Sequence, residues 1–272
     1  MTKKNVTKAY DNSEFLHSRS ARPLRVLAEF IEPEERLRKH GIHNTIVFFG
    51  SAISVDNRTF RKQTPNSTVV PEKAVRVSNA HEACTELAKR ITTWSQEIED
   101  PTRRFYVCSG GGSGIMEAAN KGAELAGGKS IGFNITLPLE QFLNPHITPE
   151  LRFNFHYFFI RKFWFLYYAK ALIGFPGGFG TMDEVFESLV LIQTLRQASF
   201  PVILMASEYW KGLVDWIETK MLAENKFISP EDLKVYTVVD DPKEAARIIV
   251  DFKQSEKYRG LDMPPGMKKT SA

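Results

Sequence analysis

Two glycine-rich turns constrain the fold of this chain more than any other feature of its sequence. The turn 110–114 (GGGSG) follows the apolar run 105–108, and the turn 176–181 (PGGFGT) follows the apolar run 171–175. A helix-like pattern comes after each turn. Glycine lets backbone N–H groups come close to a ligand, and the unpaired amides of a helix start carry partial positive charge. We therefore expect a phosphate-bearing ligand that is held from two sides.

Strand-like apolar runs alternate with helix-like segments along most of the chain. The expected strands are 45–49, 105–109, 130–135, 152–158, 171–175, 201–205 and 235–239. The expected helices are 79–98, 114–126, 159–169, 181–196, 207–224 and 242–253, after one or two short helices within 23–40. Because most strands are unbroken apolar runs, the alternation predicts a parallel sheet covered on both faces. The predicted fold class is therefore α/β, a doubly wound parallel sheet with helices on both faces in a single domain.

The order of strands and turns also predicts the place of the site. Ligands of doubly wound folds bind at the carboxyl ends of the strands. The turns that follow Phe49, Ser109 and Phe175 would all emerge at this edge of the sheet. The sequence thus predicts a ligand site at the carboxyl edge.

Polarity and proline positions divide the chain into four parts. We expect a flexible N-terminal lead at 1–20, a helical extension at 21–43, the single α/β domain with the phosphate-ligand site at 44–255 and a loose C-terminal tail at 256–272. Within the domain, the polar and proline-containing segment 56–73 is expected to be a long loop, either disordered or acting as a lid.

Composition excludes several classes of function. The chain is 43% hydrophobic and 25% charged, with a net charge of +4 and no dense stripe of Lys and Arg, so nucleic-acid binding is not expected. Cys84 and Cys108 do not form a disulfide framework. Residues 1–20 lack the apolar core of a signal peptide, and no apolar run is long enough to span a membrane. We expect a cytoplasmic protein with no membrane partner.

Common phosphate and metal motifs are also absent. The dinucleotide fingerprint G-x-G-x-x-G fails at Ile115 or at Glu117, depending on the glycine from which it is counted. The Walker pattern that ends in 128–130 (GKS) has Ala123 where a glycine is needed. The six histidines do not show metal-ligand spacing. NAD, FAD, a nucleoside triphosphatase reaction and a metal site are therefore not expected.

The helix after the second turn begins with Thr181-Met182-Asp183-Glu184, for which two interpretations stay open. In the first, Thr181 is the N-cap and Glu184 bonds back to its N–H, which forms a capping box. In the second, Glu184 is a catalytic carboxylate one turn from the phosphate cradle, and Asp183 shares this duty. Glu184 can also serve both roles.

A pair of cations, Arg161 and Lys162, interrupts the aromatic stretch 158–165. They are either charges that reach solvent from a buried helix or a cationic clamp on phosphate or ribose. A helix dipole contributes about 0.3–1 kcal/mol, up to about 2 when partly buried, whereas a micromolar ligand needs about 8 kcal/mol. Because two helix ends are too weak alone, we favour the clamp.

These motifs together resemble the Lonely Guy (LOG) family of cytokinin riboside 5'-monophosphate phosphoribohydrolases, long labelled possible lysine decarboxylases. The resemblance runs from about Thr45 to Gln193, and its most specific parts are 110–117 (GGGSGIME), 176–184 (PGGFGTMDE) and the preceding Arg-Lys pair. It implies a Rossmann-like fold, a homodimer or higher homo-oligomer, and neither metal nor nicotinamide cofactor. The aromatic helix near 158–168 is either a part of the oligomer interface or simply core.

The resemblance also implies roles for individual residues. Arg161 and Glu184 match the catalytic arginine and glutamate. The remaining candidates bind substrate, and they are Gly50, Ser51, Gly110, Gly111, Gly112, Ser113, Gly114, Met116, Glu117, Lys162, Gly177, Gly178, Gly180, Thr181 and Asp183. The N-terminal extension, the 56–73 insertion and Glu117 at a position that is often glycine match the longer bacterial subgroup. AMP is therefore as suitable a substrate as a cytokinin riboside monophosphate.

The function we expect is hydrolysis of the N-glycosidic bond of a nucleoside 5'-monophosphate, which releases free base and ribose 5-phosphate. Glu184 would stabilise an oxocarbenium-like transition state, activate water, or both. Arg161 would fix the phosphate or ribose. The group that protonates the leaving base is open, with Asp183 and Glu117 as candidates. A non-catalytic nucleotide or phosphorylated-cofactor binding protein is the alternative. A pyridoxal-phosphate decarboxylase would need a Schiff-base lysine, which no feature of Lys162 or Lys170 singles out.

Overall fold

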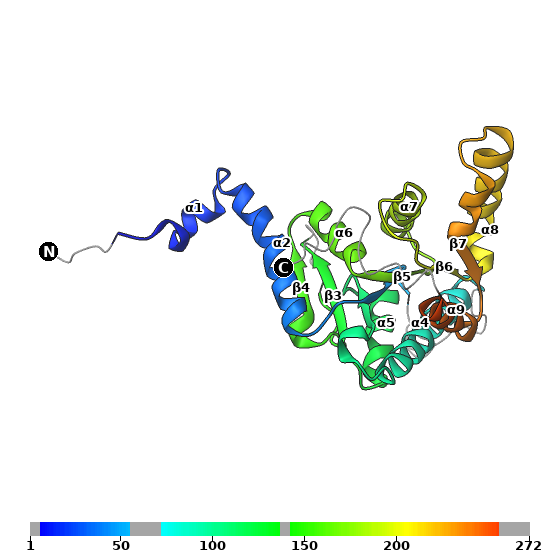
Figure 1. Cartoon of the computed structure of the whole chain (residues 1–272), viewed down its shortest axis with the longest axis horizontal. Helices are drawn as coiled ribbons and strands as arrows, with labels where there is room; N and C mark the ends of the chain where they lie inside the picture. The colour runs from blue at the N-terminus through cyan, green and yellow to red at the C-terminus, as the bar shows by residue number, and fades with distance from the viewer. Residues whose placement is uncertain (1–5, 55–71, 137–141, 256–272) are drawn as a thin grey trace, which may run out of the picture.

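A seven-stranded parallel sheet forms the centre of the protein, in the order β4-β3-β2-β1-β5-β6-β7 (Figure 1). The computed structural model describes residues 6–54, 72–136 and 142–255, without the side chains of 72–78. The strands are β1 (Thr45–Phe49), β2 (Tyr106–Ser109), β3 (Ser130–Ile135), β4 (Arg152–Phe155), β5 (Ala169–Gly174), β6 (Val202–Met205) and β7 (Tyr236–Val239). The predicted α/β doubly wound fold is confirmed.

The three strands that lead into glycine-containing turns are neighbours at the centre of the sheet. Strand β1 pairs with β2 on one side and with β5 on the other. Phe48 lies opposite Ser109 in β2, and Phe49 lies opposite Gly174 in β5, so the three strands end at nearly the same level. The turns after β1, β2 and β5 therefore lie side by side at the carboxyl edge, as predicted.

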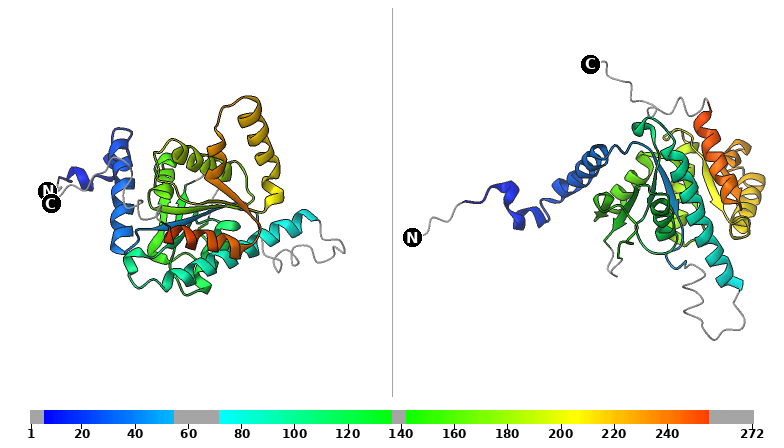
Figure 2. Two further views of the ribbon diagram at one scale, coloured as in Figure 1. Left: turned by 45° about the vertical axis from the view of Figure 1, so that its right-hand side comes forward. Right: turned by 90° about the horizontal axis from the view of Figure 1, so that it is seen from below.

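Helices cover both faces of the sheet, as Figures 1 and 2 show. The α-helices of the described residues are α1 (Ser13–His17), α2 (Arg22–Lys39), α4 (Glu72–Gln96), α5 (Ile115–Leu125), α6 (Phe158–Tyr167), α7 (Phe179–Gln193), α8 (Ser207–Trp216) and α9 (Pro242–Gln254). A π-helical segment, Ile217–Glu224, continues α8. Helices α6 and α7 lie over one face of the sheet, and α4, α5 and α9 lie over the other.

Two apolar cores correspond to these two faces. Strand β1 contributes to both, because Val47 and Phe49 belong to one core while Ile46 and Phe48 belong to the other. This alternation is the period-two geometry of a strand that is buried on both sides. Each fully buried large apolar side chain contributes about 1.5–3 kcal/mol relative to exposure. The two cores thus hold the sheet edge and its turns in place.

The N-terminal helices extend from the edge of the sheet that β4 forms (Figure 1). Helix α2 is joined to α6 through Glu29, whose carboxylate accepts hydrogen bonds from the N–H groups of His156 (2.8 Å) and Tyr157 (3.2 Å). Trp164 Nε1 donates to the Glu29 carbonyl at 2.9 Å. Part of the expected flexible lead is helical, because α1 lies within it. Among the described residues, no helix has the length and apolar character needed to span a membrane.

Some predicted boundaries are wrong. Helix α4 begins at Glu72, inside the segment expected to be a loop, while residues 55–71 lie outside the described part of the chain. The strand expected at 152–158 ends at Phe155, and α6 starts at Phe158. The helix expected at 207–224 changes to π-helical geometry after Trp216. The tail 256–272 lies outside the described residues.

Candidate functional site

The backbone of Ser51 connects the two glycine turns. Its N–H donates to the carbonyl of Pro176 at 3.0 Å, and its carbonyl accepts from the N–H of Ile115 at 3.0 Å. Gly50 lies against the Ile115 side chain, where a Cβ would be 2.7 Å from its carbons. The segment after β1 therefore separates and fixes the two turns, in agreement with the predicted proximity of Gly50 and Ser51 to them.

The first turn, 110–114, needs glycine for conformation and for space. Gly111 and Gly114 have φ angles of +75° and +70°, which other residues rarely adopt. A Cβ at Gly114 would also collide with the backbone of Ser51 and Ala52. Ser113 Oγ donates to the Ala52 carbonyl at 2.8 Å. The turn is thus held tightly against the segment after β1.

The second turn leads into α7 earlier than predicted. The helix starts at Phe179 with Gly178 as its N-cap, because the Gly178 carbonyl accepts from the N–H groups of Thr181 (3.0 Å) and Met182 (3.1 Å). No side-chain hydrogen bond caps this helix. The capping-box interpretation of Thr181 and Glu184 is therefore wrong. Thr181 is buried in the first turn of the helix, against Gly177.

Glu184 consequently faces the protein interior instead of the helix start. The residue is only 3% exposed, and its Oε2 has no hydrogen-bond partner among the described residues. Burial raises the pKa of the Glu184 carboxyl to about 8, although the Arg161 guanidinium opposes this increase. A buried carboxyl without a partner and with a pKa near neutrality is typical of functional sites.

Arg161 comes to the first turn from α6. Its Nη2 would be 3.1 Å from a Cβ at Gly110, and its guanidinium lies 5.1 Å from the ring centroid of Phe165. Arg161 Nε has no hydrogen-bond partner among the described residues. Burial lowers the pKa of Arg161, whereas Glu184 acts in the opposite direction. The two predicted catalytic residues therefore interact electrostatically, but no direct ion pair between them is present.

Lys162 and Asp183 contact each other. Lys162 Nζ lies 2.8 Å from Asp183 Oδ1 and 3.1 Å from Glu187 Oε2. Burial alone would lower the pKa of Lys162, but the hydrogen bonds to Asp183 and Glu187 outweigh burial and raise it. This cluster joins α6 to α7 and so fixes the elements that carry Arg161 and Glu184.

The two other candidates on α5 lie near the first turn. Met116 is buried, and its Sδ would be 2.7 Å from a Cβ at Gly110, so its side chain packs directly against the first turn. Glu117 Oε1 lies 3.8 Å from Nε2 of His146, whose Nδ1 is 2.6 Å from Glu124 Oε2. Glu117 thus belongs to a polar cluster on the surface of α5.

Open space remains beside the second turn. A Cβ at Gly178 or at Gly180 would meet no atom within 4 Å. The ring of Phe179, between them, is 96% exposed. Gly178 and Gly180 are exposed as well, so a ligand can approach this helix start, where backbone amides are unpaired.

Two residues that contact the turns were not predicted from the sequence. Asn144 donates through Nδ2 to the carbonyls of Gly111 (3.1 Å) and Gly112 (2.9 Å). Tyr209, on α8, donates through its hydroxyl to the Gly177 carbonyl at 2.5 Å. Neither residue is near its turn in sequence, so no local pattern indicates the contact.

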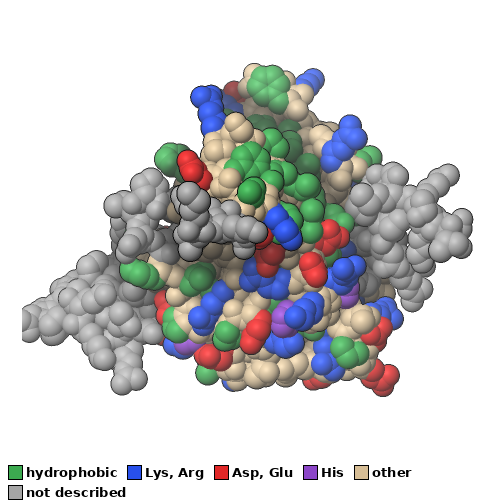
Figure 3. Space-filling model, turned by 90° about the vertical axis from the view of Figure 1, so that its left-hand side faces the viewer, with side chains coloured by type: hydrophobic (Ala, Val, Ile, Leu, Met, Phe, Trp, Pro, Cys, Tyr) green, Lys and Arg blue, Asp and Glu red, His purple; other side chains and the backbone are tan. Residues whose placement is uncertain are grey.

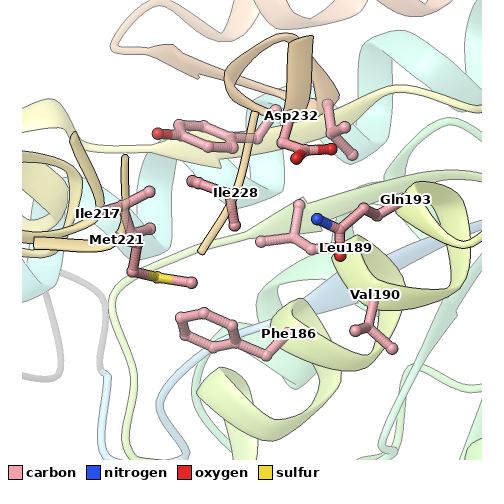
Figure 4. A pocket seen from close by; sticks show the side chains of 10 residues that line it. Phe186, Leu189, Val190, Gln193, Ile217, Met221, Ile228 and Asp232 are labelled. Atoms are coloured by element: carbon pink, nitrogen blue, oxygen red, sulfur yellow. The ribbon is translucent and has the colours of Figure 1, made fainter. Parts of the chain in front are cut away.

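A separate apolar pocket lies on another side of α7 (Figure 4). Its volume is about 100 Å³, and α7 contributes Phe186, Leu189 and Val190 to it, opposite Ile217 and Met221 of the π-helical segment. Ligand pockets usually measure about 300–1,000 Å³, so this pocket is too small for a nucleotide. Among the described residues, no cluster of His, Cys, Asp and Glu side chains could hold a metal ion.

Comparison with known proteins points to one family. The fold is that of Rossmann-like α/β proteins. The family model described as "Possible lysine decarboxylase", the LOG family, matches residues 116–249, a range that holds the second glycine turn, Arg161 and Glu184, so the chain is similar to this family. The resemblance inferred from the two turns is thereby confirmed. A search of curated proteins found no match.

Several solved structures are similar in fold. The X-ray structure of TM1055, a structural genomics target, is 23% identical and covers 76% of this chain and 99% of its own, with a TM-score of 0.48. The molybdenum cofactor carrier protein of Chlamydomonas reinhardtii is 19% identical over 78% of this chain and 99% of its own (TM-score 0.47). The molybdenum cofactor binding protein of Rippkaea orientalis is 16% identical over 76% of this chain and 94% of its own (TM-score 0.46).

Proposed function

We propose that this protein hydrolyses the N-glycosidic bond of a nucleoside 5'-monophosphate, with AMP or a cytokinin riboside monophosphate as substrate. The observation that carries the proposal is the buried Glu184 carboxyl, which has an oxygen without a partner among the described residues and lies in the field of Arg161, whose guanidinium approaches the first turn at Gly110. Similarity to the LOG family over residues 116–249 supports the same reaction class.

In this proposal, the turns 110–114 and 176–181 bind the 5'-phosphate through backbone N–H groups. An anion at these helix starts is stabilised by the free amides and by the helix dipole. Arg161, beside Gly110, adds a planar cation that suits phosphate or ribose oxygens. Its unpartnered Nε is a donor that a bound substrate can satisfy.

Glu184 acts at the sugar. Cleavage of the bond between base and ribose develops positive charge on the ribose ring, as in glycoside hydrolysis. A carboxylate in a buried site stabilises that charge more strongly than it would in water, and it can also take a proton from the attacking water. Because the Glu184 pKa is about 8, the carboxylate form becomes more populated toward mildly alkaline pH.

The family's older label, lysine decarboxylase, implies a pyridoxal phosphate cofactor, which the residues present do not fit. A Schiff base forms from a neutral amine, whereas the pKa of Lys162 is raised by its carboxylate neighbours. Lys170 is the second residue of β5 and lies toward the amino end of that strand, away from the glycine turns. Neither lysine is therefore suited to form a Schiff base with this cofactor at the glycine turns.

The decisive experiment is a chromatographic screen of AMP, GMP, CMP, UMP and isopentenyl-AMP for released base, run with the wild type and Glu184→Gln. The proposal expects free base and ribose 5-phosphate from at least one substrate with the wild type only. Calorimetric binding of all five nucleotides without base release would instead identify a non-catalytic nucleotide-binding protein.

A homodimer or larger homo-oligomer is part of the proposal. Helix α6 is both core and surface, since Trp164 and Phe165 are buried while Phe158, Phe159 and Phe163 are exposed. A view from the side of α2 shows hydrophobic side chains gathered over the upper part of this face (Figure 3). Such a patch supports association between subunits. Sedimentation equilibrium of the wild type tests this part of the proposal.

A further inference from the structure

Glycine-rich turns have a weakness as anion sites, because a peptide between two glycines can rotate with little steric resistance. A rotated peptide presents its carbonyl oxygen, instead of its N–H, to the ligand. An oxygen repels a phosphate. A working cradle therefore needs contacts that fix the orientation of its peptide planes, and such contacts come from outside the turns in this protein.

Asn144 fixes two peptide planes of the first turn. It is 4% exposed, and its Nδ2 donates to the carbonyls of Gly111 and Gly112, while its own N–H donates to the Gly111 carbonyl at 2.8 Å. In a trans peptide, the carbonyl and the following N–H point in opposite directions. The N–H groups of Gly112 and Ser113 therefore point away from Asn144.

The orientation of Asn144 is itself determined by a buried network. Its Nδ2 also lies 3.0 Å from Asn120 Oδ1, which accepts a hydrogen bond from Ser109 Oγ at 2.7 Å. Asn144 Oδ1 accepts from the N–H of His146 at 3.2 Å. Because Asn120 and Ser109 are fully buried, this network gives Asn144 a single orientation.

Tyr209 does the same for the second turn. Its hydroxyl donates to the Gly177 carbonyl at 2.5 Å, so the N–H of Gly178 points away from α8. The neighbouring Trp210 is buried, and its Nε1 donates to the Met205 carbonyl at 2.9 Å, which anchors this part of α8. Gly178 is exposed, and a Cβ at this position would meet nothing within 4 Å.

We propose that Asn144 and Tyr209 are positioning residues, which hold the carbonyls of Gly111, Gly112 and Gly177 on the protein side. The N–H groups of Gly112, Ser113 and Gly178, which have no acceptor among the described residues, then stay available for a phosphate group. This inference rests on the proposed function only in taking a phosphate ester as the ligand.

The test uses the full chain and ribose 5-phosphate, whose binding does not depend on hydrolysis. Tyr209→Phe removes only the hydroxyl, and its matched control is Tyr106→Phe, at the amino end of β2. Asn144→Ala is compared with Asn154→Ala, because Asn154 bonds to the Thr136 hydroxyl and not to a turn. Kd is measured by calorimetry, and thermal unfolding is followed for every variant.

We expect each positioning variant to weaken ribose 5-phosphate binding about three- to tenfold, the effect of one neutral hydrogen bond, while the controls bind like the wild type. For AMP hydrolysis, KM should rise by a similar factor with kcat little changed, since orientation of the phosphate contacts affects binding first. If these residues had only a structural role, their variants would have a lower Tm, but KM would not rise while kcat stayed constant.

Each other outcome has a definite meaning. If Tyr209→Phe binds ribose 5-phosphate with wild-type affinity, the proposed role of Tyr209 is refuted, whether or not the variant hydrolyses AMP. Should Asn144→Ala not fold, Asn144→Ser replaces it, and unchanged affinity there overturns the role of Asn144. A wild type that binds ribose 5-phosphate but releases no base refutes only the hydrolase. Absence of ribose 5-phosphate binding by the wild type refutes the cradle and with it this inference.

Discussion

The Glu184 carboxyl lies in the field of the Arg161 guanidinium, and yet burial keeps its pKa at about 8. Attraction to the cation lowers the pKa, but the loss of water around a side chain that is 3% exposed has the larger effect. Both groups have a polar atom without a partner among the described residues. A bound substrate can supply those partners.

Glu184→Gln should lower base release from AMP by at least about 100-fold, because the amide cannot take up a proton or carry negative charge. Ribose 5-phosphate should bind with unchanged affinity, as measured by calorimetry. Glu244→Gln, at an exposed glutamate in the first turn of α9, is the control and should retain most of the activity. Near-normal turnover in Glu184→Gln would remove this residue from the chemistry.

The rate should depend on pH through the same group. If the carboxylate is the working form, kcat/KM for AMP rises with pH and levels off above about 8, the pKa of Glu184 in the free protein. Initial rates at constant ionic strength between pH 5.5 and 9.5 measure this profile. A decrease of kcat/KM through pH 8 would instead show that the protonated carboxyl acts as a proton donor.

Stability should show the opposite trend with pH. The Glu184 pKa is raised from 4.5 to about 8 on folding. Between these values, the folded state holds a proton that the unfolded chain has lost, so the contribution of this group is complete below pH 4.5 and is lost as pH rises toward 8. From pH 6 to 8, denaturant unfolding should show the wild type losing about 1–3 kcal/mol more than Glu184→Gln. Parallel curves for the two proteins would contradict the raised pKa.

Arg161→Lys should weaken phosphate binding although it keeps the charge. Lysine lacks the planar fork that reaches Gly110 from α6, so KM for AMP should increase about tenfold or more. Arg247→Lys, at an exposed arginine paired with Asp251, serves as the control for an exchange of arginine for lysine. Equal KM values in Arg161→Lys and the wild type would argue against a clamp at this position.

Alanine substitution should separate the roles of two glycines. At Gly114, a Cβ would collide with the backbone of Ser51 and Ala52 at a positive φ angle, so Gly114→Ala should unfold at a clearly lower temperature, with a loss above about 2 kcal/mol. Gly178 has a φ of −92° and open space around its Cβ position. Gly178→Ala should therefore keep its Tm but bind ribose 5-phosphate more weakly.

The fold and the location of the site follow from local sequence features. The apolar runs that became β1, β2 and β5 are each followed by glycine, and a parallel sheet necessarily brings their ends to one edge. Boundaries within the site do not follow in the same way. Thr181 and Glu184 have the spacing of a capping box, but the Gly178 carbonyl starts α7 earlier and turns Glu184 inward.

Contacts between segments that are far apart in the sequence cannot be predicted from local sequence patterns. Asn144 reaches the first turn from a loop that follows β3, and Tyr209 reaches the second from α8. Asparagine is common in loops, and nothing in the sequence neighbourhood of either residue indicates a partner more than thirty residues away. Such contacts depend on tertiary packing, which periodicity and propensity do not describe.

The peptide groups of Ser51 occupy the gap between the two glycine turns, with the N–H bonded to one side and the carbonyl to the other. The two walls of the cradle consequently have a fixed separation before any ligand arrives. Under the proposed function, a ligand of the right size would meet donors that need little rearrangement, whereas the spacing would not adjust to a longer or shorter one. The central strand and its first loop would then select the ligand by its length.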